Sequence, residues 1–266
     1  MIKHNNWFTI KHIHPRVYSL AEFHHFEQVV SYLFIGDREA VLFDTGMGYA
    51  DILEEVRLLT SLPVHVFFTH GHWDHTGGAS LFSKVSIANH RFEMNLLARG
   101  FESVEIPELH DPGLFRDPFL PKKYDASGVS SFTTLRGGQI IKSGSYSIKV
   151  LQTPGHTPGS LCFFILEENL LFVGDTVYPG PLYAHLPESS LTDYTQSMKA
   201  LKHEANDQTV VFPGHNEVKA SFRLIEDISE AFDLIVSGWL RGDIADTVTT
   251  YTCNEFSILV KTSELH

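Results

Sequence analysis

Four apolar runs of this chain stop at a histidine or an aspartate, and this feature restricts the possible folds more than any other. The runs are VHVFFTH (64–70), YSIKVLQTPGH (146–156), LLFVGD (170–175) and TVVFPGH (209–215). Short apolar runs bounded by Gly, Pro, Asn and Asp are typical of β-strands. Loops at strand ends gather at one edge of a sheet, where a rigid scaffold can hold side chains from distant sequence positions. The sequence therefore predicts a sheet-based fold whose polar side chains meet at one edge.

Further strands and several helices are expected around these runs. Two neighbouring strands are predicted at 29–36 and 40–46, with a turn around Asp37 and Arg38 between them. The other predicted strands are 84–89, 139–144, 160–166 and 256–261. Apolar residues at helical spacing predict helices at 49–60, 91–99, 191–205 and 225–240. At 266 residues, 43% of them hydrophobic, the chain is long enough for one α/β domain with a buried core.

Residues 100–131 are rich in Pro, Asp, Phe and Gly and show no clear periodicity. A long irregular segment inside a compact domain is usually a functional loop, so we expect a lid or insertion here, and a surface insertion without function is the alternative. Its aromatic residues could line a pocket for an acyl chain, although core packing explains them nearly as well. These residues are Phe101, Phe115, Phe119 and Tyr124.

The segment THGHWDHTGG (69–78) places three histidines and one aspartate within six residues, directly after a predicted strand. Imidazole nitrogens and carboxylate oxygens are preferred zinc ligands, and the glycines allow the tight backbone path of such a turn. A chance cluster of surface histidines is the alternative, but three further candidates also follow strands. The seven candidate ligands, enough for two ions, are His70, His72, Asp74, His75, His156, Asp175 and His215.

With these motifs the chain resembles the metallo-β-lactamase superfamily from about residue 29 to residue 215. The resemblance implies a four-layer αβ/βα sandwich with the metal site at one edge of the sheets. It also implies a single domain over residues 1–266, built from two αββα-type halves with the lid or insertion at 100–131. The implied cofactors are two zinc ions, with iron or manganese as alternatives.

The same resemblance distributes the candidate ligands over the two ions. It implies that the first ion is bound by His70, His72 and His156. It implies that the second ion is bound by Asp74, His75 and His215, with Asp175 bridging the two. Asp44, in the Asp-Thr-Gly stretch 44–46, is expected to support the histidine loop from behind, with a plain turn residue as the alternative.

Individual positions narrow the branch of the superfamily that the chain resembles. Asp175 stands where antibiotic-hydrolysing members often carry cysteine, so a true β-lactamase is not expected. His72 stands where non-hydrolytic di-iron members carry an acidic residue, which argues against oxygen reduction. Tyr178 follows Asp175 at the spacing found in lactonases that open acyl-homoserine lactones. The stretch 174–194 is similar to a branch that includes acyl-CoA thioesterases, and glyoxalase II-like members are also related.

The resemblance therefore implies a dinuclear hydrolase that cleaves a thioester or lactone with a metal-bound hydroxide. Asp74 is expected to accept the proton of the nucleophile and Tyr178 to stabilise the oxyanion, with simple packing as the alternative for Tyr178. Two other functions stay open, a phosphodiesterase of the nuclease type and a metal-binding protein without turnover. The second is disfavoured because the ligand set leaves room for a water molecule, as catalytic zinc sites do.

Charge and composition restrict the partners. A formal net charge of −12, without a run of Lys or Arg, argues against nucleic acid as a partner and favours a small-molecule carbonyl substrate, with a hydrophobic acyl group as one option. No stretch approaches the roughly 18 apolar residues of a membrane span, and no signal peptide is apparent, so a cytoplasmic location is expected. The apolar residues of 228–240 could form the face of a homodimer. Most histidines outside the motifs are expected to be surface or hydrogen-bonded residues, and His24 and His185 are the two that could lie near the site.

Overall fold

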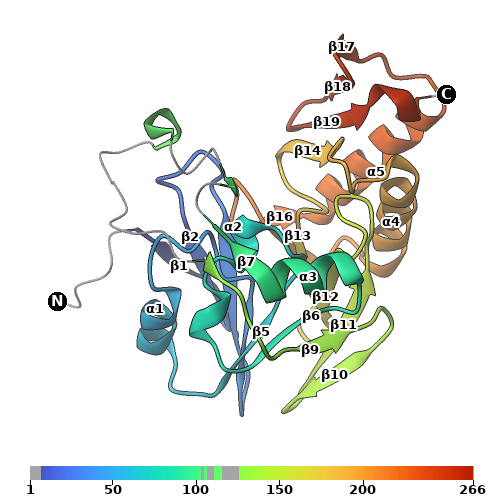
Figure 1. The fold of residues 1–266 in the computed structure, drawn as a ribbon. Helices are drawn as coiled ribbons and strands as arrows, with labels where there is room; N and C mark the ends of the chain where they lie inside the picture. The colour runs from blue at the N-terminus through green and yellow to red at the C-terminus, as the bar shows by residue number, and fades with distance from the viewer. Residues whose placement is uncertain (1–6, 103–104, 107–110, 116–125, 266) are drawn as a thin grey trace.

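The first of two large sheets is formed by the amino-terminal half of the chain. The structure, a computed structural model, describes residues 7–102, 105–106, 111–115 and 126–265 (Figure 1). In spatial order the strands are β1 (Thr9–His14), β2 (Val17–Ala21), β3 (Val30–Ile35), β4 (Ala40–Phe43), β5 (Val64–Phe67), β6 (Val85–Ala88) and β9 (Thr133–Leu135). Strands β1 to β4 are antiparallel, and β4, β5, β6 and β9 run parallel. The parallel pairing of β4 with β5 is made possible by the helical crossover α1 (Ile52–Leu59).

The second large sheet comes from the following part of the chain. In spatial order its strands are β10 (Ile140–Ser143), β11 (Tyr146–Gln152), β12 (Leu161–Ile165), β13 (Leu170–Gly174), β15 (Val210–Pro213) and β16 (Ala220–Ser221). Strands β13 and β15 are parallel, and the chain between them includes α4 (Leu191–Glu204). The remaining helical segments are α2 (Trp73–Thr76), α3 (Arg91–Arg99), α5 (Phe222–Val236), η1 (Ala79–Leu81), η4 (Pro112–Leu114) and η5 (Thr262–Glu264).

The two large sheets pack face to face, and the helices cover their outer faces. The core between the sheets joins aromatic side chains of both, for example Phe43 of β4 and Phe172 of β13, whose ring centroids are 4.0 Å apart. A second core cluster joins the first sheet to α1 and α3, and a third joins the second sheet to α4 and α5. Figure 1 shows α4 and α5 together on the outer side of the second sheet. This arrangement confirms the four-layer αβ/βα sandwich.

A smaller sheet lies next to the carboxy-terminal end of the sandwich, at the upper right of Figure 1. Its strands, in spatial order, are β14 (Gly180–Ala184), β19 (Phe256–Lys261), β18 (Val248–Thr252) and β17 (Asp243–Ala245). The pairing of β14 with β19 is parallel and joins the last strand of the chain to residues that directly follow β13. Only β19 among these four strands is predicted from the sequence pattern.

The structure describes only parts of the expected lid at residues 100–131. Its two ends are tied together by the short strands β7 (Gly100–Phe101) and β8 (Ala126–Ser127). Phe101 and Phe115 pack against the core of the first half, so core packing, the alternative reading, accounts for both. Phe119 and Tyr124 lie outside the described residues. A lid function for 100–131 therefore stays a prediction.

Most apolar side chains of α5 are buried in the core of the same chain. Ile228, Phe232 and Ile235 of α5 are buried in the core cluster of the second half. Val236 and Trp239 are 59% and 81% exposed. Leu234 is also exposed, and the expected homodimer face stays a prediction that would depend on these three side chains. Within the described residues, no helix is long and apolar enough to span a membrane.

Candidate metal centre

Side chains from both halves meet where the loops after several strands come together. Their ligand atoms form three groups, and within each group all the atoms lie within 4.8 Å of one another. The three groups are His70–His72–His156, His70–His75–Asp175 and Asp74–His75–His215. All seven residues predicted as ligands are thus brought into one place, although β5 ends at Phe67, three residues before the first histidine.

The histidine loop is held in a tight turn that leads into α2. His72 precedes this helix, and its carbonyl accepts hydrogen bonds from the N–H groups of His75 and Thr76, at 3.1 and 3.0 Å. The loop packs so closely on the chain after β4 that a Cβ atom at Gly77 would lie 2.2 Å from the Met47 carbonyl. Only glycine fits this position, because real Cβ atoms do not approach backbone so closely. The turn places Asp74 and His75 on the side of the site.

Three of the histidines are oriented by acceptors on the ring nitrogen that faces away from the site. Nδ1 of His156 lies 3.0 Å from the Tyr183 carbonyl, and Nδ1 of His215 lies 2.7 Å from a backbone carbonyl at position 27. A carbonyl can only accept, so both Nδ1 atoms carry the proton. Nε2 of His72 lies 2.9 Å from a carboxylate oxygen of Glu188. In each ring the other nitrogen is left with a lone pair that faces the centre.

Asp44 orients the two remaining histidines. Its Oδ2 atom lies 2.9 Å from Nδ1 of His75 and also accepts the hydroxyl of Thr69 at 2.8 Å. Because the Thr69 hydroxyl donates to Asp44, its oxygen accepts from Nδ1 of His70, which lies 3.1 Å away. Nε2 of both rings is therefore the free nitrogen. Through these contacts Asp44 supports the histidine loop, as expected.

In these tautomers, unprotonated ring nitrogens of different histidines face each other in two places. Nδ1 of His72 lies 3.0 Å from Nε2 of His156, and Nε2 of His75 lies 3.2 Å from Nε2 of His215. Two neutral imidazoles cannot form a hydrogen bond through two lone pairs. Each pair therefore requires a cation, either an additional proton or a metal ion. Nε2 of His70 is buried and has no hydrogen-bond partner, which is the environment of an unsatisfied ligand atom.

The carboxylate of Asp175 reaches both groups of histidines. Its Oδ1 atom lies 2.9 Å from Nε2 of His75, and its Oδ2 atom lies 3.4 Å from Nε2 of His156. Oδ1 is buried and makes no hydrogen bond of acceptable geometry. Oδ2 of Asp74 lies 3.5 Å from Nε2 of His75. Neutral imidazole nitrogens and carboxylate oxygens are the donors that divalent first-row metal ions bind, so these residues fit such ions.

Protons and metal ions compete unequally for the individual histidines, and burial is outweighed by carboxylate neighbours at His72 and His75, whose pKa is raised. Burial opposes the charged form of His215, but Asp175 outweighs it and raises the pKa of His215 to about 9. Burial lowers the pKa of His156 to about 4, and it also lowers the pKa of His70 well below its usual range. His156 and His70 are therefore neutral and ready to bind a metal at pH 7. A metal at His215 has to displace a proton.

The family model described as the Metallo-beta-lactamase superfamily matches residues 25–215, which contain all of this geometry. The chain belongs to this superfamily. The curated relatives that match include a thioesterase and a hydroxyacylglutathione hydrolase, and the chain is an enzyme of this class of metal-dependent hydrolases.

Two curated members of the superfamily illustrate the relationship. The chain is 30% identical over 206 residues to the human acyl-coenzyme A thioesterase MBLAC2, a match that covers 71% of this chain and 73% of the relative. It is 23% identical over 198 residues to the hydroxyacylglutathione hydrolase GloC of Haemophilus influenzae, covering 71% and 86%. One relative is thus named as a thioesterase and the other as a hydrolase of hydroxyacylglutathione.

Solved structures of the superfamily share the fold. A metallo-beta-lactamase from Pontibacter korlensis superposes with a TM-score of 0.61 at 16% identity, covering 85% of this chain and 99% of that one. A metallo-beta-lactamase family protein from Thermus thermophilus gives a TM-score of 0.62 at 22% identity, with 85% and 82% covered. At these identities the likeness concerns the fold alone.

A cavity of about 540 Å³ opens directly onto the candidate ligands of this superfamily member. Its apolar walls come from Phe26, Trp73, Tyr178, Tyr183 and Leu186. Acidic side chains also line it, namely Glu27, Glu217 and Glu255. No Lys or Arg among the residues that the structure describes lines this cavity.

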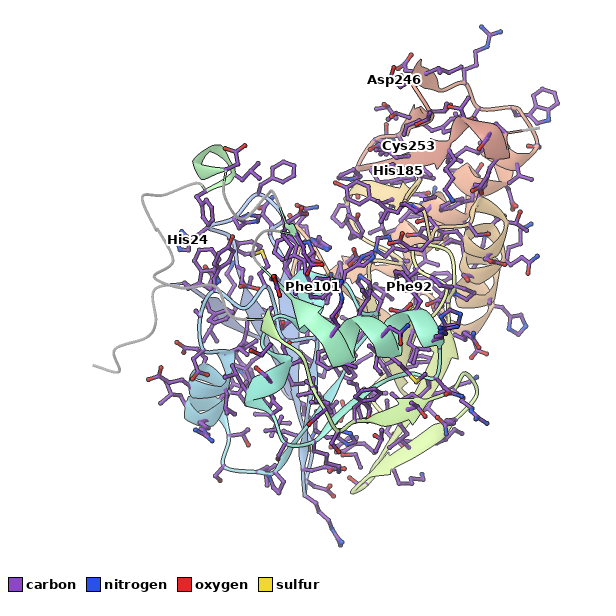
Figure 2. The ribbon with its side chains drawn as sticks, in the orientation of Figure 1. His24, Phe92, Phe101, His185, Asp246 and Cys253 are labelled. Carbon is purple, nitrogen blue, oxygen red and sulfur yellow. The ribbon has the colours of Figure 1, made fainter. Side chains whose placement is uncertain are left out.

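Tyr178 lies at the wall of the cavity, but its hydroxyl is engaged. The ring centroid lies 5.0 Å from that of His215, and the hydroxyl donates to the Pro181 carbonyl. Burial raises the pKa of Tyr178 well above its usual range, so the phenol stays protonated. His24 and His185, the other histidines expected near the site, lie on different halves in Figure 2 and are not among the residues that line the cavity.

Glu188 is a site residue that sequence reasoning missed. It belongs to the loop between β14 and α4, and its carboxylate holds His72. The nearby carbonyl of Tyr183, which holds His156, carries no signal in the sequence at all because every residue has a carbonyl. A glutamate in a Pro- and Ser-containing loop reads as a solvated surface residue, and only the position of His72 distinguishes it.

Proposed function

We propose that the chain is a dinuclear metal-dependent hydrolase that cleaves a thioester or lactone carbonyl. The observation that supports this best is the two pairs of facing imidazole nitrogens on either side of Asp175. In this proposal the first ion is bound by His70, His72 and His156. The second is bound by Asp74, His75 and His215, and Asp175 bridges the ions. Zinc is the proposed metal because mixed imidazole and carboxylate ligands suit it, with iron or manganese as alternatives.

The chemistry divides between the metal ions and the protein. Bound ions would supply Lewis acidity and a hydroxide nucleophile at neutral pH. Asp74 lines the cavity and is proposed to accept the proton of the nucleophile. Tyr178 is proposed to donate its phenolic hydrogen to the oxyanion, which requires that it exchange the Pro181 carbonyl for the substrate. The fold thus supplies a proton acceptor and a proton donor on the walls of one cavity.

The cavity and the relatives together favour an uncharged acyl group. Phe26, Trp73 and Leu186 provide apolar surface for a hydrophobic acyl chain beside the candidate ligands. The thioester-hydrolysing relatives support a thioester as the reacting group. The acidic cavity disfavours the phosphodiester alternative, because phosphodiester substrates are anionic.

We also propose that residues 1–266 form a single domain, because strands of both halves share the core between the two large sheets. The contribution of residues from both halves to one group of candidate ligands supports the same proposal. A cytoplasmic location stays a prediction.

A substrate panel tests the proposed function directly. Zinc-loaded protein is assayed with an acyl-CoA, S-lactoylglutathione, an acyl-homoserine lactone and bis-p-nitrophenyl phosphate, and Asp175→Ala serves as the inactive control. We expect turnover of a thioester or the lactone at a rate that Asp175→Ala reduces by at least a hundredfold. Turnover of the phosphodiester alone would refute the proposed reaction.

A further inference from the structure

Glu93 lies in the first turn of α3 and joins two loops that carry candidate metal ligands. Its side chain is fully buried, with 0% of its surface exposed. Oε2 accepts a hydrogen bond from the N–H of Gly71 at 2.7 Å, and Oε1 accepts one from the N–H of Gly159 at 2.9 Å. Gly71 lies between His70 and His72 in the sequence. One carboxylate is therefore bonded to loops from both halves of the sandwich.

Helix α3 lies next to the two loops that the Glu93 carboxylate connects. Figure 2 shows the end of α3 marked by Phe92, next to Glu93, on the side of the second half, whereas the chain leaves the helix toward Phe101 on the other side. Gly159 belongs to the same loop as His156, which connects β11 to β12. Two of the hydrogen bonds to the Glu93 carboxylate come from backbone N–H groups, so they fix the paths of the two loops, and the Thr157 side chain adds a third contact in the loop of His156.

The two glycines leave the space that the glutamate fills. A Cβ atom at Gly71 would lie 2.9 Å from Oε2 of Glu93, and one at Gly159 would lie 2.3 Å from its Cγ. The loops and the carboxylate therefore touch at distances that larger residues would not allow. This close fit means that a shift of the Glu93 side chain is transmitted to both loops.

A buried carboxylate is unfavourable unless donors compensate for the lost hydration. Burial is the main influence on Glu93 and raises its pKa, against the hydrogen bonds from Thr157, Gly71 and Gly159. A neutral apolar residue would avoid this desolvation. An apolar side chain, however, could not accept hydrogen bonds from two loops at once.

From these contacts we propose that Glu93 is a positioning residue that sets the spacing between His70, His72 and His156. It thereby determines the affinity of the site for the ion that these three residues hold. The proposal rests on the ligand assignment of the proposed function. In the part of the chain that the structure describes, Glu93 forms no hydrogen bond with a ligand side chain, and it holds the two loops through the N–H groups of Gly71 and Gly159 and the Thr157 side chain.

The test measures stepwise metal affinity by chelator competition, with cobalt absorption spectra as a second readout. In Glu93→Gln only one side-chain atom can accept, and the amide group opposes the other N–H. We expect the first ion to bind 10- to 100-fold more weakly, as for other residues that support ligands, and the second ion to bind as before. His156→Ala and His215→Ala provide the reference behaviour for loss of the first and of the second ion.

Two further variants separate positioning from general stability. Gly159→Ala keeps the charge but pushes the loop away from Glu93, and it should weaken the first ion in the same way. Glu55→Gln removes another buried glutamate, on α1, and should leave both affinities unchanged.

Other outcomes are equally decisive. Equal weakening of both ions in Glu93→Gln, or unchanged affinities with a lower unfolding temperature, would overturn the positioning role while the proposed function stands. Wild-type protein that binds no metal ion would instead overturn the proposed function and the inference that rests on it.

Discussion

Nε2 of His75 lies 3.2 Å from Nε2 of His215, which is 140 positions further along the chain. Each ring donates its Nδ1 proton to a fixed acceptor, the Asp44 carboxylate or a backbone carbonyl. The two facing nitrogens therefore have lone pairs and repel each other unless a positive charge lies between them. Holding the two nitrogens in this arrangement lowers the stability of the metal-free fold, as is typical of functional sites.

Metal content is the first prediction that follows from this arrangement. Protein purified without chelator should contain about two first-row metal ions per chain, because each of the two pairs of facing imidazole nitrogens needs a cation. Asp175→Ala should lower the content, since its two oxygens reach both groups. Elemental analysis measures both, and the exposed Asp207→Ala is the matched control. Full occupancy in Asp175→Ala would show that this carboxylate does not bridge.

Asp44→Asn should weaken metal binding without disturbing the backbone. Asp44 has a positive φ of 60°, a conformation that asparagine tolerates well. The new amide can still accept from Thr69, but its NH2 group opposes the proton on Nδ1 of His75. We expect a 10- to 100-fold loss of metal affinity and a loss of about 1–3 kcal/mol in unfolding free energy. Chelator competition that gives wild-type affinity would contradict a supporting role.

Tyr178→Phe tests the proposed proton donor. If the phenol stabilises the oxyanion, kcat should fall by at least about tenfold while KM changes little. Loss of the hydrogen bond to the Pro181 carbonyl would by itself lower only the stability, by about 1 kcal/mol. Steady-state kinetics and thermal unfolding separate these effects. A normal kcat with a lower unfolding temperature would leave Tyr178 as a packing residue.

The acidic cavity should discriminate between thioesters by charge. Glu27, Glu217 and Glu255 line it, so an acyl-CoA should be disfavoured relative to the N-acetylcysteamine thioester of the same acyl chain. Raising the ionic strength from about 0.05 to about 0.5 M should increase kcat/KM several-fold for the CoA ester and leave the neutral ester unchanged. Glu217→Gln should reduce this salt effect. A fall in CoA turnover with salt would mean that attraction dominates.

Glu22 should make the stability of the metal-free protein depend on pH. Burial raises its pKa from 4.5 to about 8, although Trp7 and the Met47 N–H donate to the carboxylate. The protonated form is thus favoured by folding, and its contribution is complete below pH 4.5 and is lost as the pH rises through 8. Relative to wild type, Glu22→Gln should gain stability over this range, by up to about 1.4 kcal/mol per pH unit.

The measurement is urea unfolding of chelator-treated protein at several pH values. Glu54→Gln, an exposed substitution on α1, should give a curve parallel to that of wild type. Parallel curves for Glu22→Gln as well would show that the Glu22 carboxyl ionises normally in the folded protein.

Many of the individual strands and helices could be predicted because their periodicities are strong where burial is complete, whereas the four layers were implied by the resemblance to the superfamily. Helix 91–99 and strand 256–261 have the bounds expected from their apolar spacing. Strand β17 was missed because it has three residues and all are exposed, and β18 was missed because one of its two buried positions is a threonine, so its apolar residues do not alternate. Strand β14 was missed for another reason, since Pro181 and Gly180 are typical of turns rather than strands.

The candidate ligands could be predicted because histidine and aspartate at strand ends are chemically distinctive. The residues that orient them could not be predicted equally well. The role of Asp44 was expected because the Asp-Thr-Gly strand end matches the superfamily, whereas the roles of Glu188 and Glu93 depend on contacts between distant loops. Backbone acceptors, such as the carbonyl that accepts from His156, cannot be predicted from the sequence because every residue has a carbonyl. Which residues can bind a metal ion is therefore visible in the local sequence, whereas how their rings are oriented depends on the tertiary structure.

The parallel pairing of β14 with β19 makes the end of the chain part of the cavity. Gly180 donates to the carbonyl at position 255, and Glu255 itself lines the cavity, although the superfamily match ends at residue 215. Part of the cavity wall is thus encoded beyond the stretch that matches the superfamily and contains the candidate ligands. Exchanging the carboxy-terminal segment between relatives would alter which acyl carriers are accepted while leaving the ligand set intact.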